Sequence, residues 1–280
     1  MKRIILPTDF SANSKHAMSY ALQFFSNETC HFYLLHSYEP VAENMNHMQI
    51  SAATFNVEKS AKALSEEKLH ALQVHLEQLN NNPKHSFETV ASFNILTDEV
   101  NYLADTKKCD YVVMGTKGAT GAKEILFGSN TVQVFKKAPC PVMAIPEVAV
   151  YTKPEQVLFP TDFEIPYTTQ MLQPVLEITT NCNAQLHVLH VASKTALTTE
   201  QNRQKLTLQK LLKPLVNTFH EVEETNVSAA ILSFQETHST DMLIMIQTKK
   251  SFFESLFFTS TIHHIGHHIT KPFLVIPVTL

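Results

Sequence analysis

Short apolar runs alternate with segments of helical periodicity along this chain. The first half has runs short enough to be buried strands at Arg3 to Leu6, His31 to His36, Phe87 to Phe93, Tyr111 to Met114 and Val142 to Ile145. Between them, apolar residues recur every three or four positions, which predicts helices that begin near Ser11, by Ala61, at Ile95 and after Gly128. Strands that alternate with helices predict a parallel sheet covered by helices on both faces.

The second half of the sequence repeats the first. Four segments match in the same order: Val157 to Phe163 copies Ile4 to Phe10, Leu186 to His190 copies Phe32 to His36, Asp241 to Met245 copies Asp110 to Met114, and Lys271 to Pro277 follows Ala138 to Pro146 in outline. Ordered matches of this kind predict a duplicated domain. The expected domains are residues 1–147 and 154–280, which suits a chain of 280 residues at roughly 150 residues per domain.

Composition and charge narrow the classes of function. The chain carries 22 Lys and Arg against 26 Asp and Glu, a net charge of −4, so no nucleic-acid partner is expected. The four cysteines have neither a C-x-x-C pair nor zinc spacing, and buried, reduced thiols are expected. The first apolar run stops at Pro7, too early for a signal peptide or a membrane span, so a cytoplasmic protein without membrane contact is expected.

Four of the five glycines fall between Asp110 and Pro146. Gly115, Gly118 and Gly121 follow an apolar run, and Gly128 precedes a predicted helix. Glycine permits positive φ or close approach of the backbone to a ligand. A loop of N–H groups that leads into a helix N-terminus suits an anion, so the stretch is interpreted as a phosphate cradle. It is neither a Walker loop, because no Gly-Lys-Ser/Thr follows, nor a G-x-G-x-x-G fingerprint.

The glycine spacing carries a family resemblance. Gly115, two residues, Gly118, nine residues and then Gly128-Ser129 resembles the nucleotide-binding signature of the universal stress protein family, G-x-x-G-(nine residues)-G-[S/T]. With the internal repeat, the chain resembles a tandem member of that family over nearly its whole length. The resemblance implies two Rossmann-like, doubly wound α/β domains, each with a five-stranded parallel sheet of order 3-2-1-4-5. It also implies ATP as ligand, with Mg²⁺ as a candidate companion, and a nucleotide-dependent regulatory role in the stress response.

The resemblance also names a binding site in the first half. Pro7, Thr8 and Asp9 would line the adenine and ribose side, Ser37 would contact the adenine, Met114 and Gly115 would frame the ribose, Gly118 would let the backbone close on the phosphates, and Gly128, Ser129, Asn130 and Thr131 would hold the phosphates. The family more often has an apolar residue where Ser37 stands. Asp9 has a second interpretation as a turn residue, because the same Thr-Asp-Phe recurs at Asp162.

The second half departs from the glycine signature. Ile246 stands against Gly115, Thr248 or Lys249 against Gly118, and Phe258-Thr259 against Gly128-Ser129. Side chains with a Cβ atom hinder the close backbone approach that phosphates need. A single nucleotide site is therefore predicted, in the first domain only.

Other motifs are weaker. The H-x-G-H sequence at His264 lies late in the second half, and the cluster His263, His264, His267 and His268 lacks an acidic or thiol ligand, so neither catalysis nor a metal site is predicted. No nucleophile elbow, paired carboxylates or kinase signature is present, and an enzyme is not expected. Two alternatives stay open: an interaction module without nucleotide, and a weak ATP hydrolase or autophosphorylating protein with Ser129 as acceptor.

The last strand of each half is expected at the edge of its sheet, which leaves unpaired backbone groups. The family resemblance implies that such strands pair, so that the two halves would pack as an internal pseudo-dimer. Further association into a homodimer is left open.

Overall fold

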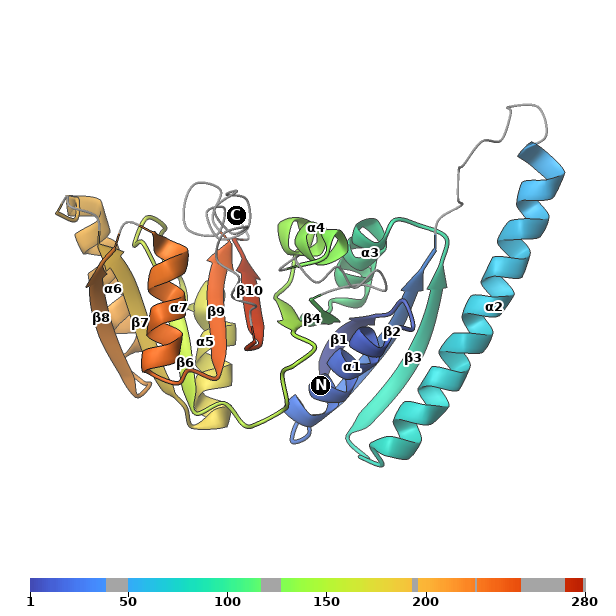
Figure 1. Ribbon diagram of the computed structural model, residues 1–280, viewed down its shortest axis with the longest axis horizontal. Helices are drawn as coiled ribbons and strands as arrows, with labels where there is room; N and C mark the ends of the chain where they lie inside the picture. Colours follow the sequence, from blue (N-terminus) through green and yellow to red (C-terminus); the bar gives the residue numbers. More distant parts are fainter. Residues whose placement is uncertain (39–49, 117–126, 193–195, 225, 248–269, 279–280) are drawn as a thin grey trace. The chain divides into compact units, whose positions relative to one another are not determined.

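A computed structural model describes residues 1–38, 50–116, 127–192, 196–224, 226–247 and 270–278 (Figure 1). The chain divides into two compact units, Met1–Glu147 and Val148–Leu280. Each unit builds a sheet of five strands, and within each unit the pairs are parallel.

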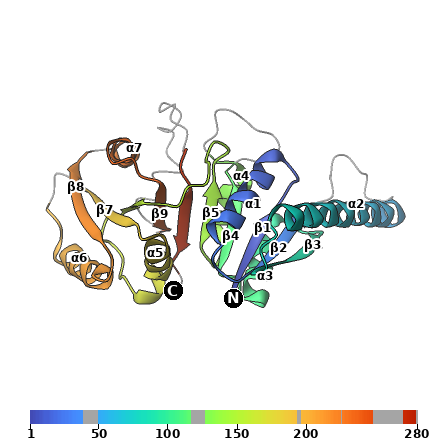
Figure 2. The ribbon, with the colours of Figure 1, turned by 90° about the horizontal axis from the view of Figure 1, so that it is seen from below.

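The first unit alternates strands and helices. Its elements are β1 (Lys2–Pro7), α1 (Ala12–Phe24), β2 (Cys30–Ser37), α2 (Ile50–Leu79), β3 (His85–Ser92), α3 (Leu96–Lys107), β4 (Tyr111–Gly115), α4 (Ser129–Lys137) and β5 (Val142–Ile145). The sheet order β3-β2-β1-β4-β5 confirms the predicted doubly wound fold of order 3-2-1-4-5. Helices α1 and α2 contact the sheet on one face, and α3 and α4 contact it on the other (Figures 1 and 2).

The second unit has the same order of strands. Its elements are β6 (Gln156–Pro160), α5 (Thr169–Cys182), β7 (Gln185–Ala192), α6 (Thr199–Leu212), β8 (Asn217–Glu223), α7 (Val227–Thr237), β9 (Met242–Gln247) and β10 (Phe273–Pro277). The order β8-β7-β6-β9-β10 is that of the first unit, strand for strand. The repeat recognised in the sequence is therefore a repeat of the fold.

The central strands explain why the sequence reads as continuous apolar runs. Ile4, Ile5 and Leu6 of β1 are fully buried, as are Val157 and Leu158 of β6. A parallel strand with helices on both faces buries side chains on both sides, so alternation of polar and apolar residues disappears. Full burial of such a side chain contributes roughly 1.5–3 kcal/mol, so these strands stabilise the core of each unit.

Helix α2 begins at Ile50, whereas the sequence predicted a convincing helix only by Ala61. The prediction relied on an apolar stripe of Leu69, Leu72, Leu76 and Leu79. The first three are buried, whereas Leu79 in the last turn is exposed, so its place in the stripe was wrong. Once that packed part has formed, adding residues at its N-terminal end costs little, because the unfavourable step of helix formation is nucleation. The stripe marks the part of α2 that packs on the sheet, and the helix extends beyond it.

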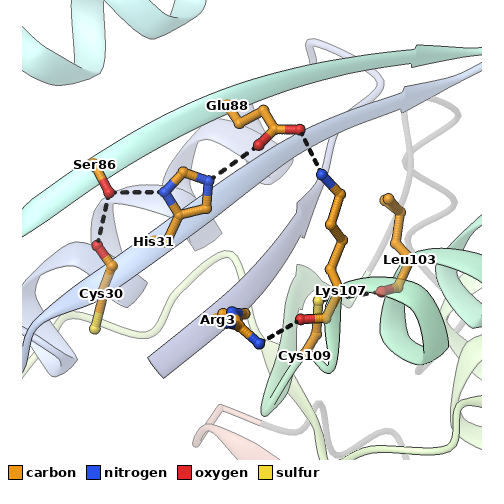
Figure 3. Close-up of polar contacts among 8 residues, drawn as sticks. All are labelled: Arg3, Cys30, His31, Ser86, Glu88, Leu103, Lys107 and Cys109. Carbon is orange, nitrogen blue, oxygen red and sulfur yellow. Dashed lines mark hydrogen bonds and ion pairs between the residues drawn. The ribbon is translucent and has the colours of Figure 1, made fainter. Parts of the chain in front are cut away.

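A polar ladder holds the edge strand β3 against β2 and α3 (Figure 3). Lys107 Nζ contacts Glu88 Oε1 at 3.1 Å, the other Glu88 oxygen lies 3.3 Å from His31 Nε2, and His31 Nδ1 lies 2.8 Å from Ser86 Oγ. Burial raises the pKa of Glu88, but the hydrogen bonds from Lys107 and His31 outweigh it and leave that pKa below its usual value. Because water still reaches these half-exposed groups, the ladder fixes the strand's position more than it adds stability.

Three imidazoles cluster on the face of the second sheet beneath α7. The ring centroids of His187, His220 and His238 lie 5.2, 5.3 and 5.5 Å apart. His187 Nδ1 lies 3.0 Å from His220 Nε2, and His187 Nε2 lies 2.7 Å from Gln156 Oε1. Burial lowers the pKa of His187 and of His220, and the neighbouring imidazoles lower both further. Both effects favour the neutral form of His187 and of His220.

Among the described residues, the search for a helix both long and apolar enough to cross a membrane found none.

Candidate functional site

The turn from β1 to α1 is tied together by its own side chains. Thr8 Oγ1 accepts from the backbone N–H of Phe10 at 2.9 Å, and Asp9 Oδ1 accepts from that of Ser11 at 3.0 Å. Phe10 adopts a positive φ of 64°, a conformation that a bulky residue rarely takes. Ser11 then caps α1 by accepting from Ser14 N–H at 3.2 Å. The turn thus holds its backbone in place at the carboxyl edge of the sheet.

His36, near the end of β2, supports this turn from the neighbouring strand. Its Nδ1 lies 2.7 Å from the carbonyl oxygen of Thr8, so that nitrogen carries the proton and donates. The imidazole packs on Phe10 with 4.5 Å between ring centroids, and Lys68 Nζ of α2 lies 5.5 Å from the centre of the same phenyl ring.

The second unit contains the same device. Phe163 has a φ of 58°, Asp162 Oδ1 accepts from Glu164 N–H at 3.0 Å, and His190 Nδ1 donates to the Thr161 carbonyl at 2.9 Å. Because the Thr-Asp-Phe turn is identical where the glycine signature is lost, its aspartate is required by the turn itself. The turn interpretation of Asp9 is supported by this geometry, and its exposed carboxylate still lies at the sheet edge.

Gly115 ends β4 at the point where the strand order reverses. Strands β1 and β4 pair at Ile5 and Val112, and both strands run on beyond this last pair. Asn13 of α1 is buried there, 7% exposed. A Cβ atom on Gly115 would lie 3.0 Å from Cγ and Nδ2 of Asn13 and 3.1 Å from its Oδ1. The absence of a side chain on Gly115 therefore leaves room for Asn13, a residue that sequence patterns did not single out.

Helix α4 starts directly after the glycine stretch. Gly128 is its N-cap and has ordinary extended dihedrals, φ −63° and ψ 155°, without a side-chain cap hydrogen bond. Gly128 N–H donates to the carbonyl of Thr116 at 2.7 Å, which fixes where the helix begins. Ser129 and Asn130 are exposed. The first turn of α4 thus has backbone N–H groups without intrahelical partners and carries the positive end of the helix dipole.

Thr131 has a different role from its neighbours in the first turn. It is buried, 2% exposed, and its hydroxyl donates to the carbonyl of Gly115 at 3.0 Å. That hydrogen bond fastens α4 to the end of β4. The predicted phosphate role of Thr131 is therefore left to its backbone N–H, because its hydroxyl is committed to the protein.

Ser37 ends β2, and its hydroxyl is also used within the protein. Ser37 Oγ donates to the carbonyl of Asn94 at 2.8 Å. The side chain of Asn94 donates to Glu99 Oε2 at 3.2 Å, and Ser92 Oγ donates to the same oxygen at 2.8 Å. Glu99 is buried, 8% exposed, so this network is a structural brace of the sheet edge. An adenine at this edge would meet the backbone around Ser37 more readily than its hydroxyl.

Larger side chains stand at the equivalent edge of the second unit. Tyr167, whose hydroxyl hydrogen-bonds to Thr161, occupies the place that Ser14 has in the first unit. Ile246 at the end of β9 stands where Gly115 stands. Among the described residues, they line with Phe159 and Asp162 a cavity of about 20 Å³, which is room for roughly one water molecule.

The remaining predicted residues divide between buried positions and parts outside the description. Pro7 is buried at the end of β1, in register with Leu35, and Met114 is buried, 6% exposed, in β4. Gly118, the second glycine of the signature, lies outside the described residues, as do Phe258 and the cluster from His263 to His268. Within the described parts, the search for three or more acidic, histidine or cysteine side chains able to hold a metal found no group.

Comparisons with known proteins agree with this fold and its duplication. The model of the universal stress protein family matches residues 1–146 and 154–277. Two universal stress proteins of Methanocaldococcus jannaschii are 28% and 27% identical to this chain over 158 and 152 residues; each alignment covers 51% of this chain, with 81% and 94% of the respective relative.

A solved universal stress protein from Archaeoglobus fulgidus matches across both units. Its TM-score is 0.67 at 18% identity, over 98% of this chain and 96% of that one, which establishes likeness of fold. The family model covers nearly the whole sequence in two copies, and the described sheets have the doubly wound order in both. The chain therefore belongs to the universal stress protein family, as a member with two tandem domains.

Proposed function

We propose that the first domain binds ATP at the carboxyl edge of its sheet, and that the bound nucleotide sets the state of a non-enzymatic regulatory protein of the stress response. The phosphates would lie at the first turn of α4, against the backbone of Gly128, Ser129 and Asn130. The observation that carries the proposal is this helix start: an N-cap glycine without a side-chain cap, at the end of a glycine signature that the family uses for ATP.

The position of α4 in the fold favours the same ligand. The helix begins beside the gap between β1 and β4, the point of strand reversal at which open α/β sheets bind ligands. A helix N-terminus attracts negative charge, and exposed Ser129 offers a hydroxyl beside the N–H groups. Mg²⁺ would come with the phosphates rather than with a protein cage, as is usual for this ion.

The second domain is proposed to bind no nucleotide. This proposal is supported by Tyr167 and Ile246, which stand where the first domain has Ser14 and Gly115 and which line a cavity with room for about one water. An enzymatic role is not proposed. Asp9 is the carboxylate predicted on the ribose side, and it already accepts a hydrogen bond from the Ser11 N–H in the turn.

Isothermal titration of the full chain with ATP tests the proposal, with one equivalent per chain expected. Gly128→Val should weaken binding strongly, since valine fits the backbone dihedrals of residue 128 but places methyl groups over the cradle. Phe258→Val, at the matching position of the second domain, is the control and should leave affinity unchanged. Two equivalents per chain, or full affinity in Gly128→Val, would contradict the proposal.

Two alternative functions have their own readouts. An interaction module without nucleotide would gain no thermal stability from ATP, whereas selective binding to the folded state raises the melting temperature. An ATP hydrolase would release phosphate, and autophosphorylation would add mass to Ser129 after incubation with ATP and Mg²⁺.

A further inference from the structure

A row of aromatic rings follows the carboxyl edge of the first domain's sheet from β1 to β3. Phe10 after β1 packs on His36 of β2, with 4.5 Å between ring centroids. His36 is followed by Tyr38 at 6.1 Å, and Tyr38 by Phe93 after β3 at 5.7 Å. The row lies at the edge where the nucleotide is proposed to bind.

The outer end of this row is open to solvent. Phe93 is 41% exposed, and Ile95, two residues further on, is 51% exposed. Tyr38 is half-buried, and its ring meets that of Phe93 at an angle of 56°. The two rings therefore form a corner, and a flat molecule stacked on one of them would turn its edge toward the other. Apolar surface of this kind, gathered at a ligand edge, is typical of a binding site.

The second domain has only the inner part of this aromatic row. It keeps the inner pair, with Phe163 and His190 at 4.8 Å between centroids. Counted along the paired strands, Tyr38 corresponds to Ala192 and Phe93 to Glu223. The outer aromatic pair is thus dispensable for the sheet, and it is present in the copy that has the glycine signature.

The distance between the aromatic corner and the phosphate cradle suits a nucleotide. The cradle lies at the end of β4, and the corner lies beyond β2 and β3, with β1 between them. Three strand spacings of about 4.8 Å place the two about 14 Å apart. A nucleoside triphosphate has an anionic end and a flat aromatic end that are separated by a phosphate chain and a sugar, and it can bridge such a gap.

We propose that Tyr38 and Phe93 form the base-stacking corner of the site and hold the adenine of the bound nucleotide. This inference rests on the proposed function and names the residues that recognise the base. A purine ring would stack on one aromatic face with its edge toward the other. Loss of one stacking partner lowers affinity for a base by between about fivefold and 150-fold.

The chain has no tryptophan, which allows a direct test. In Phe93→Trp the single indole would report stacking through quenching of its fluorescence when ATP or adenosine is added. Tyr102→Trp is the matched control, because Tyr102 is an aromatic residue of α3 that is 61% exposed and lies outside the row. Quenching in Phe93→Trp without quenching in Tyr102→Trp is the expected result. Equal responses, or none in Phe93→Trp while ATP still binds, would overturn the inference.

Affinity measurements separate this inference from the proposed function. Tyr38→Ala and Phe93→Ala should each lower the affinity for ATP at least fivefold and leave the affinity for inorganic tripolyphosphate unchanged. Tyr102→Ala should change neither affinity. Phe93→Leu keeps apolar bulk but loses the ring, so this variant should bind ATP nearly as weakly as Phe93→Ala does. Full ATP affinity in both alanine variants would reject the corner and leave the phosphate cradle standing. Absence of ATP binding in the unmodified chain would reject the proposed function itself.

Discussion

Gly115→Ala is expected to destabilise the first domain through its contact with Asn13. The added methyl group would lie 3.0 Å from Cγ and Nδ2 of Asn13, whereas comfortable contacts between such atoms are about 3.5–4.0 Å. A shift of roughly 0.5 Å is therefore needed within a buried contact, and overpacking of this kind costs about 1–3 kcal/mol. Gly115 has no positive φ, so alanine fits its backbone conformation. Alanine also restricts the unfolded chain, which stabilises the folded state by about 0.4–1 kcal/mol. The expected net loss is about 1–2 kcal/mol.

A double-mutant cycle with Asn13→Ala isolates the contact. In the Asn13→Ala background the crowded side chain is absent, so Gly115→Ala should be neutral or slightly stabilising. The coupling free energy should then be about 1–2 kcal/mol, as for residues in direct contact. Urea titration of the full chain, read by hydrogen exchange of β4 peptides, restricts the measurement to the first domain.

The same cycle decides between packing and ligand contact as the reason for the glycine. If Gly115 serves only Asn13, ATP affinity should be restored in the double variant. If the absence of a side chain also lets the ribose approach, ATP affinity should stay low in both backgrounds. An equal stability loss for Gly115→Ala with and without Asn13 would refute the packing argument.

Three further predictions follow from buried groups. Thr131→Val should cost about 1–3 kcal/mol in urea titrations, because it removes the hydroxyl that donates to the Gly115 carbonyl, and Thr131→Ser should restore most of that loss. The second domain should lose stability as pH falls below about 6.5, because the unfolded chain then protonates His187 and His220 while their lowered pKa values keep them neutral in the folded state. The loss should end near the pKa values of the folded state. The measurement is the urea midpoint of hydrogen exchange in β7 and β8, and a midpoint that does not move between pH 8 and 5 would contradict the prediction. Burial raises the pKa of the Cys30, Cys109 and Cys140 thiols to about 12, so half-buried Cys182 should react first with iodoacetamide at pH 8, as mass spectrometry of each peptide can show.

Much of the fold follows from local patterns. Runs such as Ile4 to Leu6 are apolar at every position because helices cover both faces of a parallel sheet, and this signal survives without knowledge of neighbours. The duplication was visible as well, since repeated strand ends such as Leu6 to Phe10 and Phe159 to Phe163 carry the same turn. Element ends were less accurate, as the earlier start of α2 illustrates, because helix propagation beyond a packed stripe leaves no apolar periodicity.

The sequence by itself determined the family, through the glycine spacing and the internal repeat, and the strand order was implied by that resemblance. The same spacing predicts the stretch in which a phosphate cradle would lie. It could not assign tasks to individual side chains. Only the tertiary structure decided that Gly115 makes room for Asn13, that the hydroxyls of Ser37 and Thr131 are committed to carbonyl groups, and that Tyr38 meets Phe93. Each of these contacts joins residues from different elements, and a contact of that kind depends on how strands and helices pack rather than on any local pattern.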